Sequence, residues 1–308
     1  MPPAPSSINS TMNLQEWLML FLLAAIWGGS FFLVAVAVKD LPPLTVALLR
    51  VGFAAITLWM VVLALGLALP RSIKVWQAFF IMGLLNNAIP FTLIVWGQTH
   101  IESGLAAILN ATTPLSTVIV AGIFLADERI TVAKVTGVLL GFAGVLVMLL
   151  PTLAGGSSNH LWGQLAILGA AISYAFAGTY GRRFRTMGIS PMVTAAGQVT
   201  CSTLWLLPFA WFIEQPLSLA MPPLSTWLAV MALAVVCTAF AYILYFRILS
   251  TAGATNLALV TLLVPVTAIL LGMLVLDETL DGTHVIGLAL IALGLFVIDG
   301  RLWRLLRR

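Results

Sequence analysis

Ten apolar stretches follow one another along almost the whole chain, and they limit its fold more than any other feature. Each is close to the length of about 20 residues that a helix needs to cross the hydrocarbon core of a bilayer. The links between them are short, and none is long enough to hold a soluble domain. The sequence therefore predicts an all-α integral membrane protein with ten transmembrane helices, at residues 14–38, 43–68, 75–98, 102–125, 132–150, 162–184, 190–213, 222–249, 253–276 and 282–300.

Charged residues are scarce and unevenly distributed. They make up 8% of the 308 residues, whereas soluble domains have roughly a quarter. With the N-terminus in the cytoplasm, twelve of the 14 Lys and Arg fall on the cytoplasmic side, Lys39 lies outside and Arg50 lies within a span. This asymmetry follows the positive-inside rule, so both termini are predicted to be cytoplasmic. The membrane topology then explains the net charge of +4, which therefore does not indicate a nucleic-acid partner. Residues 1–13 are predicted to be disordered, and residues 301–308 form a basic cytoplasmic tail that rests on anionic lipid.

The chain repeats itself after about half its length. A proline, an acidic residue and two glycines recur with nearly the same spacing in each half, as Pro114, Glu128, Gly137 and Gly144 and then as Pro265, Glu278, Gly287 and Gly294. "PLTVALLR" (43–50) likewise falls where "PMVTAAGQ" (191–198) falls. Each copy has five spans, an odd number, so the second copy is inserted upside down. The sequence thus predicts two inverted five-helix repeats, 14–151 and 160–300, around a midplane site that opens to either side.

These features resemble a known family. The ten spans, the duplicated proline span and the span ends "ADERIT" (126–131) and "LDETLDG" (276–282) are similar to the drug/metabolite transporter superfamily, EamA type, over about residues 14–300. Within it the chain looks most like the YddG-type amino-acid exporters. The resemblance implies export of small molecules across a bacterial inner membrane without a cofactor.

Aromatic residues in spans 1, 3, 6 and 8 are the first candidates for contact with a substrate. They are Trp27, Trp96, Tyr174, Tyr242 and Tyr245. Rings inside a cavity hold an apolar side chain, and through their faces they also hold a cation. The alternative is that some of them lie in the aromatic belts at the membrane surface. Trp96 and Tyr245 are close enough to span ends to fit that second interpretation.

Prolines and amides inside the spans are the second set of candidates. The helix-breaking prolines are Pro90, Pro114 and Pro265. A proline frees the carbonyl four residues earlier, which in hydrocarbon needs a partner or a polar cavity. Asn86 and Asn110 stand at two of these positions, and Asn87 follows Asn86. The three amides either line the substrate cavity or form hydrogen bonds between helices.

Arg50 is the only basic residue well inside a span. It follows Pro43 by seven residues, which places it roughly 10 Å below the outer surface. A lipid-facing arginine would cost about 2.5–3.5 kcal/mol. Arg50 is therefore interpreted either as an anchor for a substrate carboxylate or, the interpretation favoured here, as a side chain that snorkels or pairs with Asp40 or Glu102.

The acidic residues lie in links or near span ends. The pairs Asp127-Glu128 and Asp277-Glu278 are predicted to stabilise the starts of spans 5 and 10, and Gly137, Gly141 and Gly144 with Gly287 and Gly294 to allow close packing of those spans with each other or with spans 4 and 9. Ion-driven carriers usually hold an acid at mid-depth, and this chain has none, which indicates facilitated diffusion.

No catalytic motif or metal-ligand spacing is present, and both cysteines lie within spans. We therefore expect a monomeric carrier rather than an enzyme, without catalytic residues, metal or cofactor, whose partners are the bilayer and a small-molecule substrate. It is predicted to export small metabolites, amino acids first, by alternating access. The alternative is efflux of aromatic or quaternary cations, which aromatic faces also accept.

Overall fold

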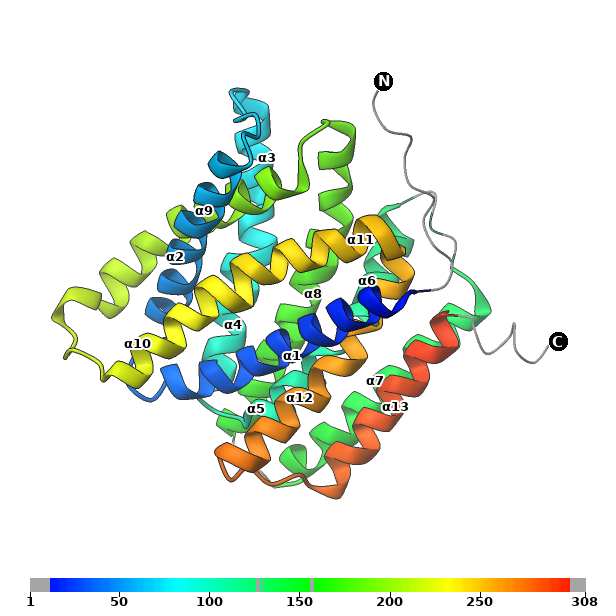
Figure 1. The fold of residues 1–308 in the computed structure, drawn as a ribbon. Helices are drawn as coiled ribbons and strands as arrows, with labels where there is room; N and C mark the ends of the chain where they lie inside the picture. The colour runs from blue at the N-terminus through cyan, green and yellow to red at the C-terminus, as the bar shows by residue number, and fades with distance from the viewer. Residues whose placement is uncertain (1–11, 126–127, 129, 156–157, 300–308) are drawn as a thin grey trace.

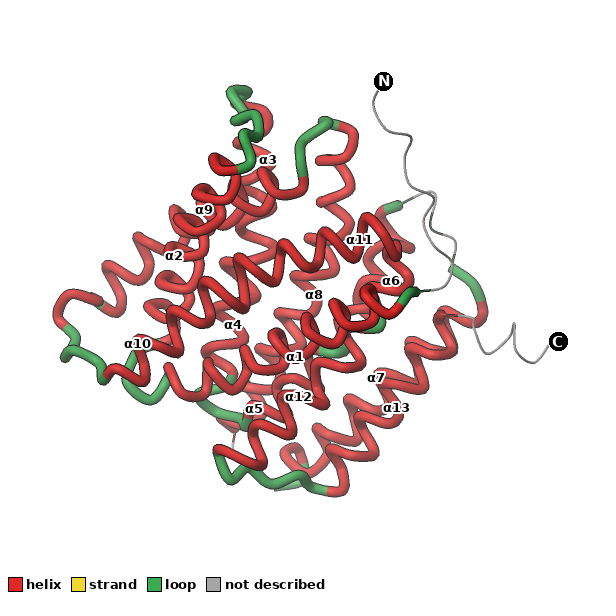
Figure 2. Tube along the Cα trace, viewed as in Figure 1, coloured by secondary structure: helices red, strands yellow, loops and turns green. Residues whose placement is uncertain are grey.

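The computed structural model describes residues 12–125, 128, 130–155 and 158–299, and within these ranges every regular element is a helix (Figure 2). Eight helical segments are long and apolar enough to cross a bilayer, and two shorter apolar helices bring the total in the described ranges to ten. This confirms the predicted fold class. The tail 301–308 and residues 1–11 lie outside the described residues. Asn13 caps the first helix by accepting a hydrogen bond from the Glu16 amide at 2.9 Å, so the predicted disorder does not reach residue 13.

The helices divide between the two halves of the chain (Figure 1). Those of the first half are α1 (Leu14–Ala37), α2 (Pro43–Ala64), α3 (Ile73–Gly83), α4 (Ile89–Gly97), α5 (Ser103–Asn110), α6 (Thr113–Phe124) and α7 (Val132–Leu153). Those of the second half are α8 (Ser158–Thr186), α9 (Pro191–Phe209), α10 (Leu224–Met231), α11 (Ala241–Leu257), α12 (Val260–Val275) and α13 (Gly282–Asp299). Three π-helical segments (Leu84–Ala88, Ala210–Glu214 and Ala232–Phe240) and the 3₁₀ turn Pro216–Ser218 join some of them.

Spans 3 and 4 are each interrupted near a proline. Pro90 follows the π-helix Leu84–Ala88, and Pro114 follows the turn between α5 and α6; each is the second residue of its helix. The first N–H groups of a helix have no acceptor within the helix, so a proline at this position loses no hydrogen bond. The Asn110 carbonyl accepts a hydrogen bond from the Thr113 hydroxyl at 2.7 Å. The prolines therefore mark where these spans break. Pro265 instead lies inside α12.

Helices α7 and α13 lie side by side along one edge of the bundle (Figure 1). A Cβ atom on Gly137 would lie 2.5 Å from the Gly294 carbonyl oxygen, and one on Gly144 would lie 2.6 Å from the Gly287 carbonyl oxygen. Only glycine lets the two backbones approach this closely. The prediction that spans 5 and 10 pack on each other is confirmed. Gly141 in addition faces Leu115 of α6.

The two ends of the bundle differ in charge. We call one the acidic end, which carries Asp40, Glu102, Glu214 and Glu278, and the other the basic end, which carries Arg71, Lys74, Lys134 and Arg182. At the acidic end, Glu214 accepts hydrogen bonds from the amides of Leu44 and Thr45 at 2.9 and 2.7 Å, and Thr226 donates one to Asp40.

Glu278 corrects one prediction. It caps the start of α5, accepting hydrogen bonds from the Ser103 and Gly104 amides at 2.8 and 3.0 Å. The prediction that Glu278 stabilises the start of α13 is therefore wrong, because its carboxylate binds the start of α5. Glu128 stands at the basic end, where it pairs with Lys134 and Arg182. Asp127, the other member of the predicted pair, lies outside the described residues.

Candidate functional site

A group of polar side chains meets in the interior where the two halves of the chain face each other. We call it the central cluster, and its members are Arg50, Asn86, Asn87, Gln198, Thr238 and Tyr242. They come from α2, the π-helix Leu84–Ala88, α9, the π-helix Ala232–Phe240 and α11. Each first-half residue in it bonds to a second-half residue. The cluster therefore spans the interface between the repeats.

The Tyr242 hydroxyl is the meeting point of two amides. It accepts a hydrogen bond from the Asn86 Nδ2 at 3.1 Å and another from the Asn87 Nδ2 at 3.0 Å. Asn86 also donates to Gln198 Oε1 at 3.3 Å. Both asparagines lie on the π-helix Leu84–Ala88, and π-helical turns often occur at functional sites.

Arg50 is buried in the same cluster, with 5% of its surface exposed. Its Nε donates a hydrogen bond to the Thr238 hydroxyl at 3.0 Å, and its guanidinium lies 3.9 Å above the centroid of the Phe91 ring. Thr238 donates its own proton to the Leu233 carbonyl at 2.8 Å, which leaves its oxygen free to accept from Arg50. Among the described residues no carboxylate pairs with Arg50. The favoured prediction, snorkelling or pairing with Asp40 or Glu102, is therefore wrong.

Arg50 and Gln198 occupy equivalent positions in the two repeats, since they end the matched stretches 43–50 and 191–198. Each reaches across to the π-helix of the other half: Arg50 to Thr238, and Gln198 to Asn86. The cluster is thus built from positions that the pseudo-two-fold symmetry of the two halves relates to each other. The sequence analysis missed Gln198 and Thr238, although the repeat alignment already contained the signal for Gln198.

Aromatic side chains adjoin the cluster. The rings of Trp27 and Tyr245 lie 5.8 Å apart between centroids, and both residues are half-buried. Tyr174 packs against two separate clusters of buried hydrophobic residues in the bundle interior. The structure therefore places Trp27, Tyr174, Tyr242 and Tyr245 half-buried within the helix bundle, and their contact with a substrate stays a prediction.

Trp96 and Asn110 stand apart. Trp96 is 37% exposed near the acidic end, with its ring 4.6 Å from that of His100, a position that favours the belt interpretation. Asn110 ends α5 at the helix break, and its Oδ1 is buried without a hydrogen-bond partner among the described residues. Asn87 Oδ1 is likewise buried without a hydrogen-bond partner among the described residues, and Asn87 as a whole is fully buried. Such acceptors suit a ligand that brings its own donors.

In the described part of the chain, no three His, Cys, Asp or Glu side chains gather in a group that would hold a metal ion. The central cluster instead offers a cation, amide groups and aromatic faces. Groups of these kinds are able to form hydrogen bonds and ring contacts with polar organic molecules.

The fold defines a membrane protein built from two similar five-span halves, and comparison with known proteins agrees. Residues 15–150 and 161–299 each match the EamA-like transporter family, so the chain belongs to that family of membrane transporters. It is 31% identical over 293 residues to the uncharacterized inner membrane transporter YedA of Escherichia coli, covering 92% of both chains. It is 26% identical over 288 residues to an uncharacterized transporter of Archaeoglobus fulgidus, covering 92% of this chain and 99% of that protein. A solved crystal structure shares the fold with a TM-score of 0.67 at 24% identity, covering 96% of this chain and 99% of the other.

Proposed function

We propose that this transporter exports small metabolites that carry a carboxylate, amino acids first, by alternating access through the central cluster. Arg50 is the carboxylate anchor. Asn86, Asn87 and Tyr242 bind the polar part of the substrate, and Trp27, Tyr174 and Tyr245 receive its side chain. Asn110 supplies a further acceptor from the broken span.

The observation that carries this proposal is the state of the Arg50 guanidinium. Removing a charged group from water costs several kcal/mol unless a partner compensates it. Arg50 has a hydroxyl and a ring face as neighbours, but no carboxylate among the described residues. A guanidinium has five N–H donors, and two parallel ones match the oxygens of a carboxylate. A substrate carboxylate would supply the missing charge.

The alternative is efflux of aromatic or quaternary cations, because tyrosine and tryptophan faces attract cations. Arg50 argues against it, since its positive charge is held at Thr238, four residues before Tyr242, one of the rings that would bind a cation. A zwitterion avoids this conflict by presenting its carboxylate to Arg50 and its ammonium to an oxygen such as Asn87 Oδ1.

Facilitated diffusion is the proposed mode. The described acidic side chains lie in links or at helix ends, such as Glu16 in the first turn of α1 and Glu214 at the end of its π-helix. A proton- or sodium-driven carrier would usually place one at mid-depth. We further propose that the basic end faces the cytoplasm of a bacterium, with both termini inside and the protein monomeric in the inner membrane.

The test is growth protection. Cells that overproduce the protein are challenged with toxic amino-acid analogues and, separately, with cationic dyes, and cells that produce the Arg50→Met variant at equal membrane level serve as the control. Protection against analogues, lost in the variant, is expected. Protection against dyes alone would support cation efflux, and protection against neither would contradict both functions.

A further inference from the structure

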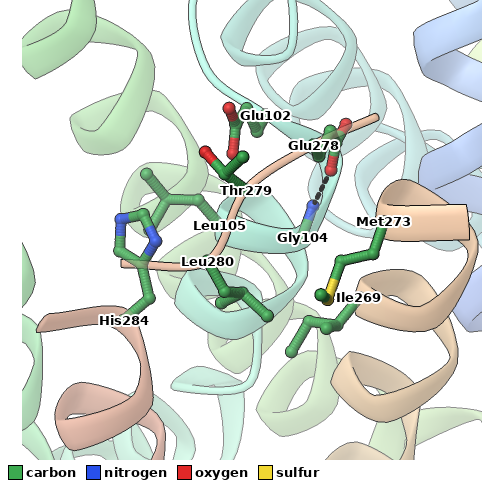
Figure 3. Close-up of a pocket in the computed structure, with 9 residues that line it drawn as sticks. All are labelled: Glu102, Gly104, Leu105, Ile269, Met273, Glu278, Thr279, Leu280 and His284. Carbon is green, nitrogen blue, oxygen red and sulfur yellow. Dashed lines mark hydrogen bonds between the residues drawn. The ribbon is translucent and has the colours of Figure 1, made fainter. Parts of the chain in front are cut away.

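At the acidic end, Glu278 joins the second half of the chain to the first. Figure 3 shows the hydrogen bond that the Gly104 amide donates to its carboxylate. The same carboxylate also accepts a hydrogen bond from the Ser103 hydroxyl at 2.8 Å. Gly272 makes room for it, because a Cβ atom there would collide with Glu278 Oε2. Asp277, just before it, has a φ of 55°, in the left-handed region that few non-glycine residues adopt. The backbone is thus shaped to deliver this carboxylate to the start of α5.

Glu128 is the repeat partner of Glu278, and it is bound differently. Glu128 follows Gly122 by the same number of residues as Glu278 follows Gly272. Its carboxylate bonds Lys134 Nζ at 3.0 Å and Arg182 Nη2 at 2.7 Å. The space at Gly122 is filled by Ile130, whose Cγ1 would lie 2.8 Å from a Cβ on that glycine. One repeat therefore has its carboxylate seated beside the glycine, and the other does not.

The repeat also identifies where Glu128 would dock. Gly253 and Ala254 lie as far before Glu278 as Ser103 and Gly104 lie before Glu128. At Gly253 the backbone of α11 leaves the helical conformation, with φ of 79° and ψ of 169°, and a new helical turn follows. This turn begins span 9, as α5 begins span 4. Its first amides are the counterparts of those that Glu278 holds.

We propose that Glu278 and Glu128 are a pair of alternating latches. Glu278 seated on α5 holds the acidic end closed in this structure. When that latch opens, Glu128 leaves Lys134 and Arg182, displaces Ile130 from Gly122 and binds the amides at Gly253 and Ala254, which closes the basic end. The inference rests on the proposed alternating-access carrier, and it names the contacts that set the direction in which the cavity opens.

The energetic balance suits a switch. Glu278 binds the start of α5, where exposed amides and the helix dipole favour negative charge. Glu128 would bind the backbone of the turn that follows Gly253. Glu128 gives up two contacts at the surface, and ion pairs at that exposure contribute little. Neither latch therefore needs to be so stable that it locks the protein in one state.

Spin-label distances test the proposal without measuring transport. Labels on Thr99 and Gly282, both exposed, report on the acidic end, and labels on Val132 and Ser250, also exposed, report on the basic end. The background replaces the two buried cysteines, Cys201 by alanine and Cys237 by serine. The variants are Glu278→Gln and Gly272→Ala, which remove or obstruct the seated carboxylate, and their repeat partners Glu128→Gln and Gly122→Ala.

We expect both Glu278→Gln and Gly272→Ala to lengthen the Thr99–Gly282 distance and shorten the Val132–Ser250 distance. Loss of a hydrogen bond to a charged group shifts the ratio of the two conformations about tenfold or more. Glu128→Gln and Gly122→Ala should leave the closed acidic end as it is. Unchanged distances in folded Glu278→Gln and Gly272→Ala protein would overturn the latch, as would lengthening at both ends at once. Failure of amino-acid transport with these distance changes intact would count against the proposed substrate, not the latch.

Discussion

Replacing Arg50 by methionine separates a substrate anchor from a structural arginine. Methionine keeps much of the volume and removes the charge, the hydrogen bond to Thr238 and the contact with Phe91. If Arg50 binds a carboxylate, the variant loses an interaction of about 1.5–3 kcal/mol. That loss corresponds to about a 10- to 150-fold increase in the Kd for an amino acid. The stability of the fold should move in the other direction or not at all, because replacing a buried ionic group by an apolar one is often neutral or stabilising.

The assay is competition between a radiolabelled amino acid and its unlabelled analogues for purified protein in detergent, with thermal unfolding measured in parallel. Wild type should prefer the free acid to its methyl ester, and Arg50→Met should lose that preference. Gln198→Met is the matched control, since it removes the repeat partner of Arg50 and its bond to Asn86 but no charge. Arg50→Lys should bind weakly, because lysine lacks the planar fork. The reasoning is refuted if Arg50→Met keeps wild-type affinity and preference, or if it unfolds readily while Gln198→Met does not.

Three further predictions concern other parts of the molecule. Tyr242→Phe removes the acceptor of both asparagine amides, and we expect a loss of about 1–3 kcal/mol in thermal stability and reduced transport; unchanged values for both would contradict the role of the hydroxyl. Gly144→Ala should destabilise the α7–α13 pair by about 1–3 kcal/mol in chemical denaturation. Gly178→Ala, where a Cβ meets open space inside helix α8, should be neutral or slightly stabilising, and equal effects of the two substitutions would refute the glycine contact. Burial, with the nearby charges of Glu278 and Asp281, raises the pKa of Glu102 above its ordinary value of 4.5. The protonated Glu102 therefore favours the folded state, and this stabilisation is lost as pH rises from the pKa of Glu102 in the unfolded chain through its pKa in the folded protein. Glu102→Gln should therefore melt higher than wild type at neutral pH but not at pH values below 4.5, and a pH-independent difference would be the contrary result.

The span positions and the inverted repeat could be predicted from sequence because both depend on local patterns. Bilayer thickness fixes the length of each apolar stretch, and the odd number of spans fixes the inversion. The glycines of α7 and α13 were also predictable, since small residues at helical spacing allow close backbone contact. In each case the physical cause acts on neighbouring residues or on a whole segment.

Contacts between distant residues were less predictable. No proline or glycine interrupts Ala232–Phe240, so nothing in the sequence indicated that this stretch is a π-helix that turns Thr238 towards Arg50. Glu278 lies just before α13 in the chain, but the fold of the intervening link delivers it to α5 instead. The sequence favoured an Arg50 that snorkels or pairs with Asp40 or Glu102, whereas in the fold it contacts Thr238 and Phe91, which lie far from it in the chain.

Efflux from liposomes tests the central claim most directly. Purified protein is reconstituted, the vesicles are loaded with a radiolabelled amino acid, and release is followed with no ion gradient, then with a proton or a sodium gradient. The account predicts release without any gradient, acceleration by unlabelled amino acid outside, and no acceleration by the methyl ester or by a quaternary ammonium compound. Release that stalls until an ion gradient is imposed would contradict facilitated diffusion, and absence of release for every amino acid in a broad panel would contradict the assigned substrate class.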